Sequence, residues 1–338
     1  MAPLQTRFWL CAGAPDCQDL LKYEVLSRHP ELRFAFSRPG LLTFKSESDL
    51  TTATRIGSHL AVLSGLSLGG TKTLDDVAPL VQKAWPSPPE IGACAWPTAE
   101  DEEPVDRSEL ERVEGYIRAA LHGARSAEQE LCVLVPPAAH PEYGYWVFAR
   151  LAGATRPTER VAPPEAAPSR AYSKLVEALA HFRIHLATGD TVLELGAAPG
   201  GATLALLERG LSVVAVDPAK MDARLAPLAQ EKRLLLRHIE RTAQSLTAAD
   251  VGGLPSPVSW LVSDMNLAPP VAVQQLLRAR ALVKKTLRGA ILTLKLNDSA
   301  AVDTLPKVLV ELERAFGQTP RVAHLPSHRR EVVAVIGG

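Results

Sequence analysis

Four ionisable side chains stand out because they lie in or beside apolar segments of the C-terminal half. Asp264 ends the apolar run "SWLVSD", and Lys295 lies inside "AILTLKL". Lys174 belongs to a segment with helical periodicity, and Glu331 opens the apolar run "EVVAVI". Burying an unpaired charge is costly, so such residues are either paired or placed at the open edge of a sheet. Taken singly, each also has an ordinary interpretation as a solvated, snorkelling or surface-clustered residue.

A turn rich in glycine lies between two apolar segments of the same half. Residues 190–217, "DTVLELGAAPGGATLALLERGLSVVAVD", are typical of a strand, a turn, a helix and a second strand. The small residues of the turn leave its backbone open to a ligand, and an aspartate after the second strand can accept hydrogen bonds from ribose hydroxyls. The pattern predicts a site for a nucleoside-bearing cofactor, formed by Gly196, Ala197, Ala198, Pro199, Gly200, Gly201 and Asp217.

The spacing of the turn distinguishes between cofactors. A dinucleotide site prefers GxGxxG, in which an open helix N-terminus faces a pyrophosphate. Here the spacing is G-A-A-P-G-G, with a proline at the bend. This turn favours S-adenosylmethionine, whose methionyl end needs close backbone contact and no phosphate site. A nicotinamide dinucleotide and a purely structural turn are the alternatives.

Apolar strands alternate with helices from residue 169 onward, which predicts an α/β fold with a Rossmann-like, doubly wound and mostly parallel sheet. Ligands of such sheets bind at the carboxyl ends of the strands, where Asp217, Asp264 and Lys295 fall. Two final strands without a helix between them, at 321–326 and 331–336, predict a hairpin and an antiparallel edge.

The N-terminal half has a different pattern of predicted secondary-structure elements. Residues 1–60 are typical of strand, helix, strand, strand, which predicts half of a ferredoxin-like fold. Residues 61–154 are expected to form a second α+β piece. The proline-rich segment 155–168 has the composition of a semi-rigid linker, and it precedes the regular domain at 169–338.

Composition sets the broad class. The chain has 338 residues, of which 46% are hydrophobic and 22% charged, so it can bury a large core. We expect a soluble, cytoplasmic protein, because no secretory leader or membrane span is evident. The mildly basic C-terminal half permits a polyanionic partner. The spacing of the four cysteines argues against a metal site and favours reduced, buried thiols: Cys11, Cys17, Cys94 and Cys132.

Residues 169–336 resemble the FtsJ-like ribose 2′-O-methyltransferases in the motifs "LGAAPGGAT", "SDM", "LKL" and "REV". Within this family, "APSRAYSKLVEAL", "SWLVSDM" and "HRREVVAV" are similar to the ribosomal RNA large subunit methyltransferase M enzymes. Those enzymes modify a cytidine ribose in 23S rRNA and carry a ferredoxin-like unit and a THUMP RNA-binding domain. The sequence departs from the family at Ala202, usually aromatic, and near Ile239 and Glu240, where the adenine-holding acid has no clear counterpart. The N-terminal half is also shorter, without a motif that proves a THUMP domain. The resemblance implies that residues 61–154 are a reduced THUMP-like RNA-binding region.

The resemblance implies methyl transfer from S-adenosylmethionine to a ribose 2′-hydroxyl of RNA, with 23S rRNA or a large-subunit precursor as partner. It implies that Lys174, Asp264, Lys295 and Glu331 are catalytic, and that Asp264 also lies at the cofactor. The RNA is expected to contact scattered basic residues, although such residues are also common at solvated helix ends: Lys284, Lys285, Arg288, Arg329 and Arg330.

By the same resemblance, Lys295 is the general base. To accept a proton it must be neutral, which requires its pKa to fall by ~3 units from ~10.4. Burial and Lys174 lower this pKa, whereas Asp264 and Glu331 raise it. We therefore expect positioning to contribute more than the pKa shift.

Two other classes of function remain open at this point. The domain could methylate a protein or a small molecule, although such a site does not need two lysines and a glutamate. The chain could also be a non-catalytic RNA-binding or ribosome assembly factor that has kept the fold.

Overall fold

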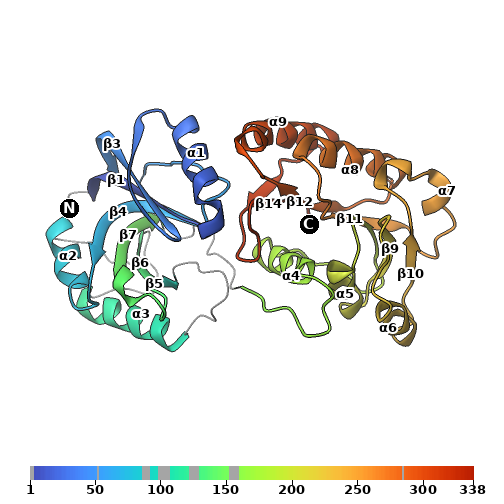
Figure 1. The fold of residues 1–338 in the computed structure, drawn as a ribbon, viewed down its shortest axis with the longest axis horizontal. Helices are drawn as coiled ribbons and strands as arrows, with labels where there is room; N and C mark the ends of the chain where they lie inside the picture. Colours follow the sequence, from blue (N-terminus) through green and yellow to red (C-terminus); the bar gives the residue numbers. More distant parts are fainter. Residues whose placement is uncertain are drawn as a thin grey trace. The chain divides into compact units, whose positions relative to one another are not determined.

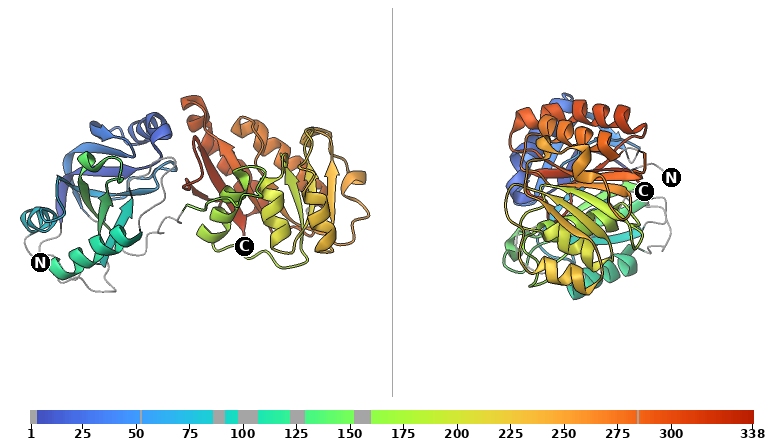
Figure 2. Two further views of the ribbon diagram at one scale, coloured as in Figure 1. Left: turned by 60° about the horizontal axis from the view of Figure 1, so that its bottom comes forward. Right: turned by 90° about the vertical axis from the view of Figure 1, so that its right-hand side faces the viewer.

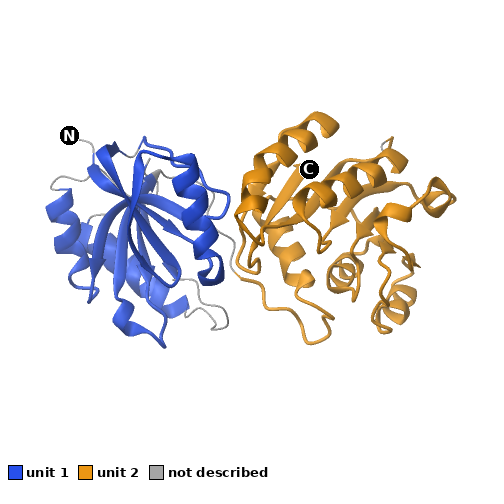
Figure 3. Ribbon diagram, turned by 45° about the horizontal axis from the view of Figure 1, so that its top comes forward, with its two compact units in different colours: residues 1–156 blue, residues 157–338 orange. Residues whose placement is uncertain are grey.

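The computed structural model describes residues 4–51, 53–85, 92–97, 107–121, 129–151, 160–283 and 285–338. The chain divides into two compact units, residues 1–156 and 157–338 (Figure 3). Within the described residues, no helix is both long and apolar enough to cross a membrane.

The N-terminal unit is built on one seven-stranded sheet in the order β2-β3-β1-β4-β7-β6-β5 (Figure 1). Its strands are β1 (Gln5–Ala12), β2 (Leu32–Arg38), β3 (Leu41–Thr51), β4 (Leu63–Thr71), β5 (Gly92–Pro97), β6 (Gln129–Val135) and β7 (Tyr145–Leu151). Its helices are α1 (Gln18–Arg28), α2 (Val77–Ala84) and α3 (Arg107–Leu121), with short 3-10 turns at Pro15–Cys17 and Pro141–Tyr143.

The boundary predicted at residue 60 does not separate two units. Strand β1 pairs antiparallel with β3 on one side and with β4 on the other, so segments 1–60 and 61–154 share one sheet. Because β3 also pairs antiparallel with β2, strands β1 and β2 are parallel with β3 between them. This is a split β-α-β arrangement, which is the building unit of ferredoxin-like folds.

The N-terminal sheet is strongly curled. Phe36 of β2 stacks on Trp146 of β7 with ring centroids 5.2 Å apart, although three strands separate β2 from β7 in the sheet. The curl encloses an apolar cluster that includes Leu10, Leu134 and Phe148. The sheet therefore provides part of its own core.

The C-terminal unit contains a second seven-stranded sheet in the order β10-β9-β8-β11-β12-β14-β13. Its strands are β8 (Thr191–Leu195), β9 (Ser212–Val216), β10 (Leu236–Ile239), β11 (Val258–Ser263), β12 (Gly289–Lys295), β13 (Arg321–Ala323) and β14 (Glu331–Gly337). Its helices are α4 (Ala171–His181), α5 (Gly201–Glu208), α6 (Leu225–Glu231), α7 (Ala248–Val251), α8 (Pro269–Val283) and α9 (Ser299–Phe316), with a 3-10 turn at Ala243–Ser245.

Helices cover both faces of this second sheet, with α4, α5 and α6 on one face and α8 and α9 on the other (Figures 1 and 2). The central strands β8 and β11 are buried along their whole length. Strands buried on both faces are expected to be mostly apolar, and the buried polar residues of these two strands are Thr191, Glu194, Ser259 and Ser263. Strand β14 runs antiparallel to β12 and β13. The prediction of a Rossmann-like, doubly wound sheet with an antiparallel edge is thus confirmed.

The predicted linker at 155–168 lies partly outside the described residues. From residue 160 onward it is attached to the C-terminal unit, because the backbone N–H of Val161 donates to the carboxylate of Glu177. Ala167 also packs against the core of this unit. The described part of the segment, predicted as a semi-rigid linker, is therefore a strap that is docked on the C-terminal unit.

Candidate active site

Three of the four predicted ionisable residues lie at one edge of the C-terminal sheet. Asp264 follows β11, and Lys295 is the last residue of β12, the parallel neighbour of β11. Glu331 is the first residue of β14 and pairs with Lys295 in the antiparallel register. Strand direction therefore brings two strand ends and one strand start to the same edge. Lys174 reaches this edge from α4.

The four side chains form a closed set of ion pairs, called here the tetrad. Nζ of Lys295 lies 2.6 Å from Oδ1 of Asp264 and 2.5 Å from Oε2 of Glu331. Nζ of Lys174 lies 3.3 Å from Oδ2 of Asp264 and 2.5 Å from Oε1 of Glu331. The lysine side chains are each 12% exposed. Each ammonium group thus bridges both carboxylates in a site largely shielded from water.

The charges of the tetrad support one another. Burial lowers the pKa of Lys295, but Asp264 and Glu331 outweigh it, so the net pKa is raised above its ordinary value. Burial raises the pKa of Asp264 and of Glu331, but Lys174 and Lys295 outweigh it and hold both below their ordinary values. Lys295 and both acids are therefore charged at neutral pH. The lowered pKa that a neutral Lys295 requires does not occur in the ligand-free tetrad.

The glycine turn lies directly beside the tetrad. The N–H of Asp264 donates to the carbonyl oxygen of Leu195, the residue before the turn, at 3.1 Å. At Gly196 a Cβ atom would lie 3.0 Å from the backbone of Met265, so the close approach of β8 and β11 requires glycine there. Gly200 has φ 112°, a left-handed conformation that glycine adopts most readily, and α5 begins at the next residue.

The predicted ribose ligand, Asp217, faces the same turn. Its Oδ2 accepts from the N–H of Ala198 at 3.1 Å, and its Oδ1 accepts from the N–H of Ala219 at 2.8 Å. These two bonds fix the carboxylate at the end of β9 while its remaining lone pairs stay available, and the side chain is only half-buried. A turn of small residues beside a fixed carboxylate suits a nucleoside-bearing cofactor.

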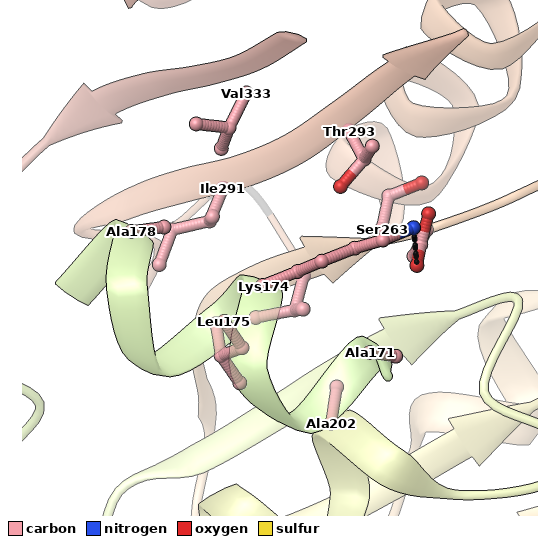
Figure 4. A pocket seen from close by; sticks show the side chains of 11 residues that line it. Ala171, Lys174, Leu175, Ala178, Ala202, Ser263, Ile291, Thr293 and Val333 are labelled. Carbon is pink, nitrogen blue, oxygen red and sulfur yellow. Dashed lines mark hydrogen bonds and ion pairs between the residues drawn. The ribbon is translucent and has the colours of Figure 1, made fainter. Parts of the chain in front are cut away.

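The residues at which the sequence departs from the family lie in two places, one beside a small cavity and the other at the end of β10. Ala202 lines a cavity of about 20 Å³, room for roughly one water molecule. Figure 4 shows this cavity beside Lys174, with Ser263 and Thr293 on its polar side and Ile291 and Val333 on its apolar side. A larger side chain at position 202 would occupy part of this space. Ile239 is buried at the end of β10, and Glu240 after it is exposed.

One buried acid near the cofactor turn was not predicted from the sequence. Glu194 of β8 is 2% exposed, and its Oε2 accepts from the hydroxyl of Thr203 at 2.6 Å. Burial raises the pKa of Glu194 to about 8, and the charges of Asp264 and Asp217 add to this rise. Glutamate in the apolar run "TVLEL" was the available signal, by the same criterion that selected Lys295.

This raised pKa predicts a specific pH dependence of stability. Because the folded pKa of about 8 exceeds the unfolded value, folded Glu194 binds more protons between pH ~4.5 and ~8. The difference in proton binding at Glu194 therefore lowers the free energy of unfolding as the pH rises through this window. Glu194→Gln should unfold at the same temperature as the parent at pH 5 and at a higher temperature at pH 9. Each kcal/mol of difference in the free energy of unfolding should shift the unfolding temperature by ~2–4 °C.

The measurement is thermal unfolding of both proteins at pH 5, 7 and 9. Glu311→Gln is the matched control, because Glu311 lies exposed on α9. A constant difference between Glu194→Gln and the parent at all three pH values would contradict the expectation.

The basic residues expected to contact RNA are partly engaged within the protein. Arg288 forms an ion pair with Asp190, and Nη2 of Arg330 donates to the carbonyl oxygen of Asn297 at 3.1 Å. Helix α8 ends at Val283, so Lys285 and Arg288 lie beyond it, and Lys284 lies outside the described residues. Within the described parts of the chain, no group of three or more metal-binding side chains is present.

Comparison with known proteins bears on this site. Residues 167–310 match the family model described as FtsJ-like methyltransferase. The C-terminal unit is an FtsJ-like methyltransferase domain. The methyl donor of this family is S-adenosylmethionine, so the match confirms the predicted cofactor.

Two relatives carry the name ribosomal RNA large subunit methyltransferase M. The protein from Laribacter hongkongensis is 32% identical over 188 residues, which cover 52% of this chain and 50% of that protein. The protein from Marinomonas sp. is 30% identical over 184 residues, which cover 51% of this chain and 49% of that protein. The matched region thus spans about half the length of these curated relatives.

Among solved structures, Aeropyrum pernix fibrillarin in complex with S-adenosyl-L-methionine is 20% identical, with a TM-score of 0.37 over 49% of this chain and 75% of that chain. TrmN from Thermus thermophilus is 18% identical, with a TM-score of 0.34 over 98% of this chain and 99% of that chain.

Proposed function

We propose that this protein transfers a methyl group from S-adenosylmethionine to a ribose 2′-hydroxyl of RNA, and that the target is a cytidine of 23S rRNA. One observation carries the proposal: a closed tetrad of two lysines and two acids is hydrogen-bonded through Asp264 to the residue preceding the cofactor turn. The relatives named for ribosomal RNA methylation support the substrate class.

The chemistry requires a group that positions the hydroxyl and takes its proton. S-adenosylmethionine supplies an electrophilic methyl group when bound. A buried ammonium at Lys295 can donate a hydrogen bond to the hydroxyl oxygen. After it has lost one proton to solvent, its neutral amine can accept the proton of the hydroxyl. Positioning can lower the free-energy barrier by up to ~7–11 kcal/mol. Base catalysis typically raises the rate by ~10²–10⁴-fold, which is a smaller reduction of the same barrier. Asp264 and Glu331 hold both lysines in place, and their charges oppose the loss of that proton.

The cofactor end of the site is assigned to the turn and to two acids. We infer that residues 196–201 contact the methionyl part through their backbone and that Asp217 accepts from the ribose hydroxyls. Asp264 links the two parts of the site, because its N–H bonds to Leu195 while its carboxylate bonds to both lysines.

The N-terminal unit is proposed to help bind the RNA, through the THUMP-like region at 61–154 together with the ferredoxin-like part at 1–60. It carries exposed aromatic side chains close to cations, such as Phe34, whose ring centroid lies 3.7 Å from Nζ of Lys22. Phe8 is also exposed, and Nζ of Lys45 lies 5.9 Å from the centroid of its ring. Aromatic and basic side chains together suit single-stranded nucleic acid, because every base can stack and every phosphate is anionic.

The proposed target is tested by mapping methylation in vitro. Unmodified 23S rRNA, incubated with the protein and S-adenosylmethionine, should gain one 2′-O-methylcytidine, detected by resistance of that linkage to alkaline cleavage. Asp264→Asn should leave the RNA unmodified. Methylation of a base, or of no RNA while a protein substrate is labelled, would overturn the proposal.

A further inference from the structure

Glu177 is a buried acid that the proposed chemistry does not use. It lies on α4, three residues after Lys174, and its side chain is fully buried. Residues three apart on a helix share a face, so Lys174 and Glu177 face the same neighbouring elements. A fully buried carboxylate is expensive unless several donors satisfy it.

Three donors from two distant segments bond to this carboxylate. Oε1 accepts from the N–H of Val161 at 2.9 Å and from the hydroxyl of Ser327 at 2.6 Å. Oε2 accepts from the N–H of Ser327 at 2.8 Å. Burial raises the pKa of Glu177, and these donors oppose the rise. Glu177 thus joins α4 to the docked strap on one side and to the loop before β14 on the other.

The loop that Glu177 holds is the one that presents Glu331. Ser327 lies four residues before Glu331, and it is buried. Within the same loop, Nδ1 of His324 donates to the backbone carbonyl oxygen of Glu331 at 2.9 Å. On the shared face of α4, Lys174 therefore bonds to Glu331 while Glu177 bonds to Ser327. Two consecutive contacts tie this helix to the start of β14.

An acid with a purely local role looks different. Asp250 is also buried, but its carboxylate accepts from the N–H and hydroxyl of Thr247, the N-cap of α7, and pairs with Arg241. These partners lie within nine residues of Asp250, whereas Ser327 lies 150 residues from Glu177. Of these two acids, it is Glu177 that joins the helix of one tetrad member, Lys174, to the loop that leads to another, Glu331.

We propose that Glu177 is a positioning residue for the tetrad: it sets the separation between α4 and the start of β14, and thereby the contact between Lys174 and Glu331. The catalytic consequence rests on the proposed function. A glutamine side chain at position 177 has the same shape as glutamate, but an NH₂ group replaces one of its two oxygen atoms. At that position a donor would face a donor, and the hydrogen bond would be lost. The loop should then move away from α4 and loosen the Lys174–Glu331 pair.

The first measurement does not depend on methyl transfer. The full-length parent and Glu177→Gln are labelled briefly with acetic anhydride, and acetylation of Lys174 is quantified by peptide mass spectrometry against the exposed Lys220. We expect Lys174 to react ~10-fold faster in Glu177→Gln, because a loosened ion pair frees the amine. Asp250→Asn should leave this ratio unchanged. An unchanged ratio in folded Glu177→Gln would overturn the positioning role.

The second measurement is kinetic. We expect Glu177→Gln to lower kcat for RNA methylation by ~10²-fold at most, the cost of a displacement of about 1 Å, with the Kd for S-adenosylmethionine changed less than ~2-fold. The double variant Glu177→Gln/Glu331→Gln should be little slower than Glu331→Gln alone, because both act through one network. Asp250→Asn and Glu331→Gln should combine multiplicatively. Multiplicative effects of Glu177→Gln and Glu331→Gln would overturn the proposal.

The two measurements separate the proposals. If the parent methylates no RNA, the proposed function fails, and the labelling of Lys174 still decides the role of Glu177. If Glu177→Gln fails to fold, Ser327→Ala provides the second variant, because it removes one hydroxyl donor and leaves the carboxylate intact. It should raise the labelling of Lys174 by a smaller factor, and an unchanged ratio would count against the proposal.

Discussion

Replacing Lys295 with alanine is expected to lower kcat for methyl transfer to RNA by ~10²–10⁴-fold, the range of a lost proton-transfer group. Lys295 bonds to both acids of the tetrad, so its loss leaves Asp264 and Glu331 with Lys174 as their remaining partner in the tetrad. Breaking a buried ion pair by removing one partner costs ~3–5 kcal/mol in stability, so the folded fraction must be measured alongside the rate.

Lys295→Arg is the sharper form of this test. Arginine keeps the positive charge between Asp264 and Glu331, but its guanidinium does not lose a proton in proteins. If Lys295 acts as the base, Lys295→Arg should fold and bind S-adenosylmethionine like the parent while remaining as inactive as Lys295→Ala. Calorimetry measures the binding, with Asp217→Ala as the variant expected to lose it. Near-normal turnover in both Lys295 variants would remove this residue from the base role.

The second large effect is a pH dependence that Glu331 controls. The pKa of Lys295 is raised in the free protein, so the neutral form becomes more abundant as the pH rises through 7–9 without reaching a plateau. Because kcat/KM reports the ionisation of the free enzyme, it should rise ~10-fold per pH unit across this range. Glu331→Gln removes one of the two charges that raise this pKa, so its profile should begin to level off at a lower pH than that of the parent, whatever its absolute rate.

Rates of methyl transfer to one RNA, measured from pH 6.5 to 9 in a single mixed buffer, check this expectation. Glu311→Gln again serves as the control, since its exposed carboxylate lies on α9. A flat profile in the parent would show that Lys295 acts in its charged form. A rising profile that Glu331→Gln leaves unmoved would show that another group accepts the proton.

The sequence was sufficient to predict the fold of the C-terminal unit because the pattern that indicates each strand and helix lies within a short segment of the chain. Apolar strands buried on both faces are recognisable from composition alone, and the absence of a helix between β13 and β14 indicated the antiparallel edge. Asp264 and Lys295 were identifiable because a charge in or after an apolar strand must either be paired or lie at the sheet edge. The N-terminal sheet was divided wrongly because the pairing of β1 with β4 is a long-range contact that no periodicity reveals.

The closure of the tetrad was decided by the tertiary structure. Lys174 lies 90 residues from Asp264, and Lys295 lies 36 residues from Glu331, so contact between them depends on strand order and on the path of α4. The direction of the pKa shift of Lys295 depends on the same distances, because burial and nearby carboxylates act in opposite directions. The sequence pattern therefore determined which residues had to be paired or placed at a sheet edge. The tertiary packing decided which partners they pair with.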